Sequence, residues 1–411
     1  MSLNRTAVAA TATCLASYLL FGVFGGAVGP TLEPFAAQVG VGLSTIGVML
    51  TTRSLGYLVG ALASTRWIDR TRIPRGLAAA ALLTAGGLTA LPWARSFALL
   101  VALGAPLGFA TAGLDVGMST ILMRTHGDRA APVISTQHFC YGVGALAAPF
   151  LVAAFSAGRE TFVYPLLAVG FALLALVCFV LPAVPARRTS VDLSSPHRLG
   201  GELPAATPTA GSTPLGRRFL TAMSVILIHV GAEMVFASWL YVFVDLQFGT
   251  ALATSVTGAF WAAFTLSRLG AVFAARRLAP ERSLAVAFAA GLAFALLLAF
   301  LPHARLAVWI GAIGVGAAVG PIYPNIITAY SRRYELTGRR FGAIAVASCT
   351  GSMTFPWLAG RLLDVGGPVV VPAGTAFLLA GAAAAAFGSF RRPPGATPAP
   401  EGQPRRRQTR K

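Results

Sequence analysis

Charged residues are scarce in this chain, and their scarcity excludes an ordinary soluble protein. Only 11% of the 411 residues are Asp, Glu, Lys or Arg, whereas a soluble domain carries about 25%. Hydrophobic residues make up 56% of the chain, and the mean hydropathy is +0.72. A surface with so few charges must face an apolar medium. The sequence therefore predicts an all-α integral membrane protein.

Acids, histidines and cysteines are also few, which argues against a membrane-embedded enzyme. The chain has 13 acids and five histidines, with neither an H-E-x-x-H zinc motif nor a nucleophile elbow. A Walker A pattern is also lacking, so nothing indicates that the chain hydrolyses ATP. The four cysteines lie in apolar stretches without metal-ligand spacing and are interpreted as small buried hydrophobes. We expect no metal, no cofactor and no enzymatic activity.

Long apolar stretches fill most of the sequence instead. A spanning helix needs about 20 predominantly apolar residues. By this criterion about 12 transmembrane helices are predicted at 6–28, 44–66, 76–93, 98–123, 133–155, 163–182, 219–243, 251–274, 283–301, 306–330, 341–363 and 369–390.

The basic residues predict the orientation of these helices. The formal net charge of +19 does not indicate nucleic acid, because the basic residues sit in short loops rather than in a stripe. With the N-terminus placed in the cytoplasm, 26 of the 32 basic residues fall on the cytoplasmic side and four on the outer side. This bias obeys the positive-inside rule for an even number of helices. Both termini are therefore expected in the cytoplasm.

Composition divides the chain into two membrane domains. Residues 1–182 form a predicted N-terminal six-helix bundle, and 219–390 form the C-terminal one. The segment 183–218 between them is rich in Pro, Ser, Thr and Gly and is interpreted as a flexible cytoplasmic linker. The tail 391–411 is basic and rich in proline, and it is expected to be disordered.

The two halves share sequence features at corresponding places. The fifth predicted helix carries Gly144 and Pro149, and the eleventh carries Gly351 and Pro356 with the same spacing. The loop after the second helix contains Asp69 followed by arginine, and the loop after the eighth contains a Glu-Arg pair. Parallel six-helix repeats are one known architecture of transporters. The pattern therefore predicts two bundles related by pseudo-symmetry.

Twelve helices, a long central linker and the Asp69-Arg70 pair together resemble the major facilitator superfamily. The family pattern in this loop is G-x-x-x-D-R-x-G-R-R/K; here Thr65 and Arg72 replace both glycines, while the acid–base core is kept. The resemblance implies the major facilitator fold and a cytoplasmic gate that includes Asp69 and Arg70. An ordinary positively charged loop is the alternative interpretation.

Short motifs narrow the resemblance to the group of fucose permease and sodium-dependent glucose transporters. These motifs are Gly113-Leu114-Asp115, Gly231-Ala232-Glu233 followed by Trp239, Phe260-Trp261 with Arg268-Leu269, and Pro321-Ile322-Tyr323-Pro324. The chain departs from the fucose permease in its first helix, where residues 19–28 contain no acid. The proton scheme of that permease therefore does not transfer whole.

Ionisable residues at membrane depth are the predicted coupling site. Each costs about 2.5–3.5 kcal/mol on insertion scales, so such residues usually face a bundle interior or a wet cavity. Asp115, Glu233 and His138 are the candidates for binding a coupling cation. A fixed buried ion pair is the alternative for either carboxylate. The roles of Arg53 and Arg268, as ion-pair partners or as residues that reach towards the interface, stay open.

Aromatic and amide side chains are the candidates for binding substrate, because aromatic rings stack on the apolar faces of a sugar while amides bond its hydroxyls. A lipid-facing aromatic is the competing interpretation. Pro321 and Pro324 are also expected to break the tenth helix and to free backbone groups towards a cavity. The candidate substrate residues are Gln137, Glu233, Trp239, Trp261, Tyr323 and Asn325.

The sequence predicts a secondary active transporter of a small polar solute. The leading hypothesis is symport of a sugar-like molecule with H⁺ or Na⁺ by a monomer in a bacterial plasma membrane. The alternative is a proton-coupled exporter of a drug or metabolite. Exporters of the family often carry G-x3-G-P-x2-G-G in the fifth helix, but here only the first glycine and Pro149 match. The partners expected are the solute, the cation and the lipid bilayer, with no nucleic acid.

Overall fold

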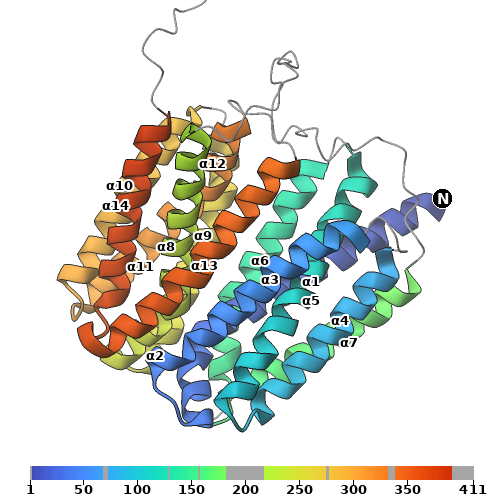
Figure 1. Cartoon of the computed structure of the whole chain (residues 1–411), viewed down its shortest axis with the longest axis horizontal. Coiled ribbons are helices and arrows are strands. Elements are labelled where there is room, and N and C mark those ends of the chain that lie inside the picture. The colour runs from blue at the N-terminus through green and yellow to red at the C-terminus, as the bar shows by residue number, and fades with distance from the viewer. Residues whose placement is uncertain are drawn as a thin grey trace, which may run out of the picture.

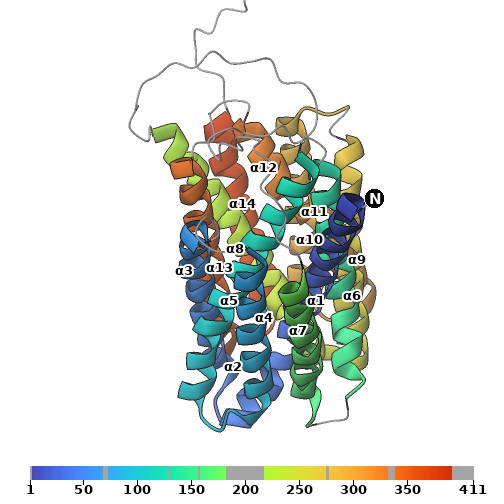
Figure 2. The same ribbon diagram turned by 90° about the vertical axis from the view of Figure 1, so that its right-hand side faces the viewer.

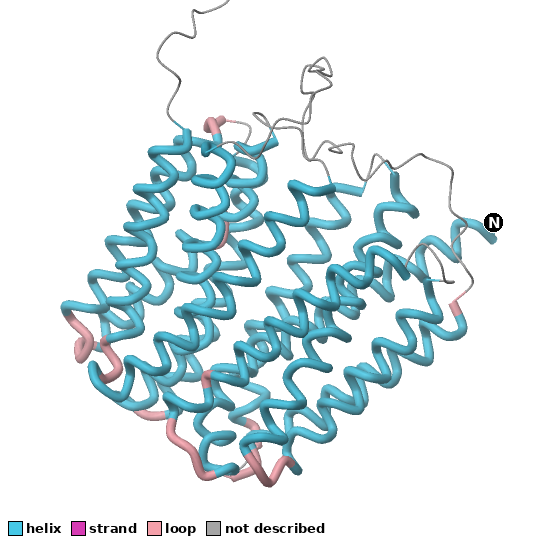
Figure 3. Tube along the Cα trace, viewed as in Figure 1, coloured by secondary structure: helices cyan, strands magenta, loops and turns pink. Residues whose placement is uncertain are grey.

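The computed structural model describes residues 2–67, 73–127, 130–155, 158–181, 217–274, 277–331 and 338–390, which are helical or in short turns and contain no strand (Figure 3). Asp69, Arg70, most of the linker and the tail 391–411 lie outside these residues. The first half contains α1 (Ser2–Val39), α2 (Leu43–Ile46), α3 (Val48–Trp67), α4 (Ile73–Ala90), α5 (Phe97–His126), α6 (Ala130–Ala153) and α7 (Val163–Val180). The second half contains α8 (Arg217–Phe248), α9 (Thr250–Ala274), α10 (Pro280–Phe300), α11 (Arg305–Val319), α12 (Ile322–Ser331), α13 (Gly338–Gly366) and α14 (Val370–Phe390).

These helices form two six-helix bundles with equivalent internal packing (Figure 1). Short α2 continues into α3, and α11 into α12, so each pair makes one span. In the first bundle α1 packs on α6, α3 on α5, and α4 on α7. In the second bundle α8 packs on α13, α9 on α11, and α10 on α14. The same three pairs recur at corresponding positions, which is the predicted pseudo-symmetry.

Glycines that sequence analysis paired across the halves have the same role in the structure. A Cβ atom added at Gly144 on α6 would overlap the carbonyl oxygen of Leu19 on α1. A Cβ atom added at Gly351 on α13 would overlap the carbonyl oxygen of Leu227 on α8 in the same way. Small residues let helix backbones approach closely in a membrane, where packing rather than the hydrophobic effect drives association. The glycine at the same position in each half therefore allows the same close helix contact.

Nine spans within the described ranges are long and apolar enough to cross a membrane by length and composition alone. The three remaining long helices are α6, α9 and α13. The same three helices pack across the interface between the bundles, α6 against α9 and α13 against α2 and α3.

The bundles are joined at the end of the molecule that contains α2, opposite to the N-terminus (Figures 1 and 2). There the hydroxyl of Thr51 on α3 donates to the carbonyl oxygen of Met353 on α13 at 3.1 Å. The indole N–H of Trp239 on α8 donates to the carbonyl oxygen of Pro356 at 2.9 Å. A Cβ atom added at Gly47 would lie 3.6 Å from the Trp239 ring, so this end is tightly packed.

The structure extends the first predicted helix and divides the tenth. The first helix was predicted to end at Val28, but α1 continues to Val39 with Pro30 and Pro34 inside it. Leu32 and Phe35 beyond the predicted end are fully buried, so tertiary packing extends the helix through both prolines. The predicted break of the tenth helix is found at Pro321, because α11 ends at Val319 and α12 begins at Ile322, whereas Pro324 lies inside α12.

Replacing Gly56 with alanine is expected to destabilise the first bundle. A Cβ atom at Gly56 on α3 would overlap the carbonyl oxygen of Ala105 on α5, so the two backbones must separate. Overpacking of this kind costs about 1–3 kcal/mol. Thermal unfolding of the purified protein in detergent measures the loss. Gly86→Ala is the matched control, because a Cβ atom there meets nothing within 4 Å. Equal melting temperatures for both variants would contradict the close approach of α3 and α5.

Candidate functional site

Four charged side chains lie well inside the helices that the structure describes, two in each bundle. Arg53 is on α3 and Asp115 on α5 of the first bundle. Glu233 is on α8 and Arg268 on α9 of the second bundle. Helices α1, α6 and α8 bring further polar groups to the same depth. Because a charge at membrane depth is costly, these four residues define the candidate site.

Asp115 is held by two tyrosines from neighbouring helices. The hydroxyl of Tyr18 on α1 donates to Oδ1 of Asp115, and the hydroxyl of Tyr57 on α3 donates to Oδ2. The hydroxyl of Ser119, one turn along α5, lies 3.2 Å from that of Tyr18. The His138 ring from α6 meets the Tyr18 ring edge-on, with 5.7 Å between centroids. An ionised carboxylate accepts only, so two hydroxyl donors suit the charged form.

Tyr18 and Tyr57 were not predicted from the sequence. The search for ionisable residues at membrane depth selects Asp and Glu, and it passes over tyrosine because tyrosine is common at membrane interfaces. The sequence does contain a signal for these tyrosines. A carboxylate inside a membrane needs hydrogen-bond donors, and Tyr57 lies one helical turn from Arg53 on α3.

Glu233 belongs to a second polar cluster, made of one carboxylate and two basic groups. Its Oε1 lies 3.6 Å from a guanidinium nitrogen of Arg268 on α9. Its Oε2 lies 3.5 Å from Nε2 of His229, one turn earlier on α8. The Glu233 side chain is 16% exposed and that of Arg268 is 27% exposed, so the pair reaches accessible space. Arg268 is thus an ion-pair partner, which decides a question that the sequence left open.

The helix break at Gly320 supports this pair. Nε of Arg268 donates to the carbonyl oxygen of Gly320, between α11 and α12, at 3.0 Å. The Arg268 guanidinium also lies over the Phe264 ring, 4.2 Å from its centroid. A broken helix presents backbone carbonyls that an intact helix would use internally. The proline-containing segment therefore positions Arg268 against Glu233.

Aromatic side chains meet across the interface of the bundles, where α6 packs on α9. Tyr141 on α6 and Trp261 on α9 meet at 6.2 Å between ring centroids. Trp261 also packs against Phe260 at 5.1 Å and Phe264 at 5.4 Å. Tyr141 interacts electrostatically with charged groups of both bundles. This aromatic group therefore lies near the charged residues of both clusters.

Two predicted substrate residues have buried polar groups without partners. Both atoms of the Gln137 amide are buried and have no hydrogen-bond partner among the described residues. The indole nitrogen of Trp261 is likewise buried and unpaired within the described part of the chain. Unsatisfied buried polar atoms are uncommon and need an explanation. A ligand that reaches α6 and α9 would provide one.

The remaining predicted substrate residues lie in different surroundings. Tyr323 on α12 interacts electrostatically with Glu233 and Arg268. The Asn325 amide donates to the hydroxyl of Ser283 on α10 at 2.9 Å, so the structure does not bring it to the charged clusters. Trp239 is fully buried at the joined end of the bundles. A role in substrate binding stays a prediction for all of these residues.

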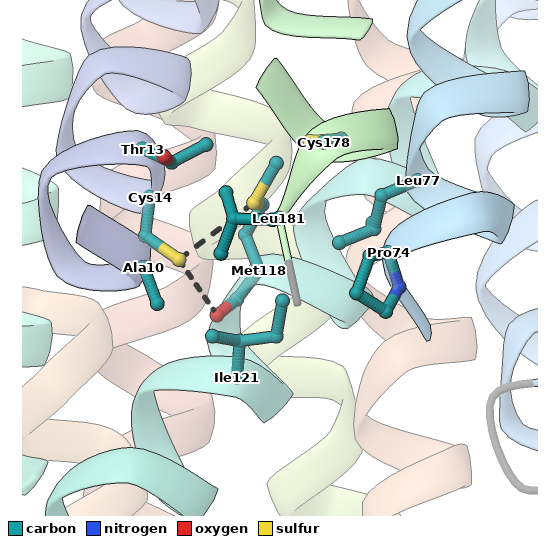
Figure 4. A pocket seen from close by; sticks show the side chains of 9 residues that line it. All are labelled: Ala10, Thr13, Cys14, Pro74, Leu77, Met118, Ile121, Cys178 and Leu181. Carbon is teal, nitrogen blue, oxygen red and sulfur yellow. Dashed lines mark hydrogen bonds between the residues drawn. The ribbon is translucent and has the colours of Figure 1, made fainter. Parts of the chain in front are cut away.

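A small apolar cavity lies apart from the charged groups, between α1, α4, α5 and α7 (Figure 4). In it, the thiol of Cys14 lies 3.5 Å from the carbonyl oxygen of Met118 and 3.7 Å from the Met118 sulfur. Its lining includes Leu77 and Cys178 and no charged side chain. This environment fits the expectation of buried cysteines for Cys14 and Cys178, and Cys349 is also buried, whereas Cys140 is half-buried.

Comparison with protein families and known proteins agrees with this architecture. The model of the Major Facilitator Superfamily matches residues 14–356. Sodium-dependent glucose transporter 1 of Rattus norvegicus is 26% identical over 374 residues, which cover 84% of this chain and 77% of that protein. Sodium-dependent glucose transporter 1A of Mus musculus is 23% identical, covering 84% of this chain and 88% of that protein.

Two solved structures share the fold. The crystal structure of the nucleoside transporter NupG superposes with a TM-score of 0.72 at 12% identity, covering 94% of this chain and 100% of that one. The E. coli fucose:proton symporter FucP superposes with a TM-score of 0.57 at 14% identity, with the same coverage. At these identities the likeness concerns the fold alone. It agrees with the predicted all-α membrane architecture of two six-helix bundles.

Proposed function

Because this chain belongs to the major facilitator superfamily, we propose that it is a symporter for a sugar-like solute and a cation, H⁺ or Na⁺. The chain is a membrane transporter and not an enzyme. The observation that carries the proposal is the position of Asp115, a carboxylate at membrane depth that is held by two tyrosines. Such a group can bind a cation and release it as the cavity changes its access. The relatives described as sodium-dependent glucose transporters support the same class of solute.

The solute would bind between the bundles, where the aromatic group meets the charged clusters. Trp261 and Tyr141 supply apolar ring faces, and Gln137 supplies an amide whose donors and acceptor are free among the described residues. A sugar presents both an apolar ring face and hydroxyls, so it matches this combination. Glu233 and Tyr323, which lie within electrostatic range of each other, would contribute polar groups from the second bundle.

We propose that both termini lie in the cytoplasm of a bacterial cell, with residues 183–218 linking the bundles there. The basic residues support this orientation through the positive-inside rule. The bundles then join at the outer end, through Thr51 and Met353. In this orientation the structure represents a state closed to the outside. Asp69 and Arg70 would belong to the opposite, cytoplasmic gate.

Uptake into liposomes that contain the purified protein tests this function. We expect accumulation of a sugar from a panel of monosaccharides when H⁺ or Na⁺ is more concentrated outside the vesicles. Accumulation that requires a more acidic interior would instead assign proton-coupled antiport, and therefore export. Transport that equilibrates without accumulation under either gradient would contradict cation coupling.

A further inference from the structure

Arg53 is a charged side chain of the candidate site that has no role in the proposed function. Its guanidinium lies over the Phe24 ring of α1, 4.5 Å from the centroid. Its backbone is fixed, because a Cβ atom added at Gly108 on α5 would overlap the Arg53 carbonyl oxygen. The side chain is partly accessible rather than sealed in the core. Arg53 is therefore a positioned and partly accessible cation at membrane depth.

No carboxylate in the described residues pairs with this cation. Within those residues, Arg53 has neither a side-chain hydrogen bond nor an ion pair. The titratable groups that act on it are the hydroxyls of Tyr57, Tyr141 and Tyr164, which are neutral. Arg268 in the other bundle differs, because it has both Glu233 and a backbone carbonyl as acceptors. A guanidinium carries five N–H donors, and none of those of Arg53 is used within the described residues.

The charges at membrane depth suggest what the missing partner is. Glu233 and Arg268 form an ion pair. Asp115 instead accepts hydrogen bonds from two tyrosine hydroxyls, so with an ionised Asp115 the four charged side chains of the site carry no net charge. When the coupling cation occupies Asp115, the site gains one positive charge that nothing in the described residues offsets. A neutral sugar would leave that charge in the membrane, whereas a carboxylate on the solute would cancel it. The loaded and empty sites would then carry the same net charge.

We propose that Arg53 binds a carboxylate of the solute, so that the transported molecule is a sugar acid of the hexuronate class. Arginine pairs with carboxylates through two parallel hydrogen bonds, which gives both affinity and orientation. The ring of the solute would extend from Arg53 towards Tyr141 and Trp261, which meet across the interface. This inference rests on the proposed sugar:cation symport and adds the chemical class of the solute.

Uptake of radiolabelled glucuronate and glucose by liposomes with the wild-type protein is the first test. We expect glucuronate to be taken up with at least a tenfold lower KM than glucose. Equal or better uptake of glucose would overturn the carboxylate assignment and leave sugar symport standing. Uptake of neither sugar, nor of any member of the monosaccharide and hexuronate panels, would overturn the symport of sugars and this inference together.

Substitution of Arg53 is the second test. Arg53→Gln is expected to raise the KM for glucuronate at least tenfold while changing that for glucose by less than threefold. Arg53→Lys keeps the charge but loses the paired hydrogen bonds, so an intermediate KM is expected. Arg95→Gln in an exposed loop is the matched control for loss of one positive charge. Equal losses for both sugars in Arg53→Gln would show a structural role and would contradict the proposal.

Discussion

Asp115→Asn is expected to abolish uphill accumulation of the solute while sparing its downhill exchange between two pools. The amide is permanently neutral, so it imitates the carboxylate with its cation bound. Its oxygen still accepts from one of the two tyrosine hydroxyls, and its volume is unchanged. The protein should therefore fold and still open its site alternately to the two sides of the membrane. A cation gradient can no longer drive accumulation of the solute. Accumulation and counterflow in liposomes measure the two activities separately.

Asp364→Asn is the matched control for this substitution, because Asp364 is an exposed carboxylate near the end of α13. It is expected to accumulate solute like the wild type. Tyr18→Phe and Tyr57→Phe each remove one donor to Asp115 and should weaken coupling without abolishing it. Wild-type accumulation by Asp115→Asn would show that this carboxylate does not couple transport to a cation.

The helices were predictable because hydropathy depends on local composition. The prediction failed where distant contacts decide, as at the end of α1, where buried Leu32 and Phe35 hold the helix beyond Pro30. The break between α11 and α12 was predictable, because prolines remove backbone donors locally. Hydropathy thus locates a span, but tertiary packing sets its ends.

Within the candidate site, only the charged residues, whose insertion into a membrane costs free energy, stood out in the sequence. Asp115 and Glu233 stand out because a buried charge is expensive wherever the helix faces. Residue type does not show which way a side chain points around the helix axis, because this direction changes by about 100° from one residue to the next. For this reason Asn325 was grouped with the substrate residues, although its amide meets Ser283 on α10. The partner of Glu233 also depends on how α8 packs on α9, which no local pattern encodes.

Glu233→Gln is expected to lower the stability of the protein as well as its transport. Removing one member of a buried ion pair strands the other, at a cost of about 3–5 kcal/mol. We expect the lower end of this range, because the Glu233 and Arg268 side chains are 16% and 27% exposed. Thermal unfolding in detergent should show a clear fall in melting temperature. Asp115→Asn should not show a comparable fall, because no buried cation pairs directly with Asp115 in the described structure.

The double variant Glu233→Gln/Arg268→Gln distinguishes an ion pair from a coupling site. If the pair is mainly structural, the double variant leaves no unpaired buried charge. Its melting temperature should then return towards that of the wild type, and transport should return with it. If Glu233 also binds the cation or the solute, stability should recover while accumulation stays lost. We expect this second result, because the Glu233 side chain is 16% exposed and can therefore be reached by a ligand. Recovery of wild-type accumulation in the double variant would reduce Glu233 to an element of the fold.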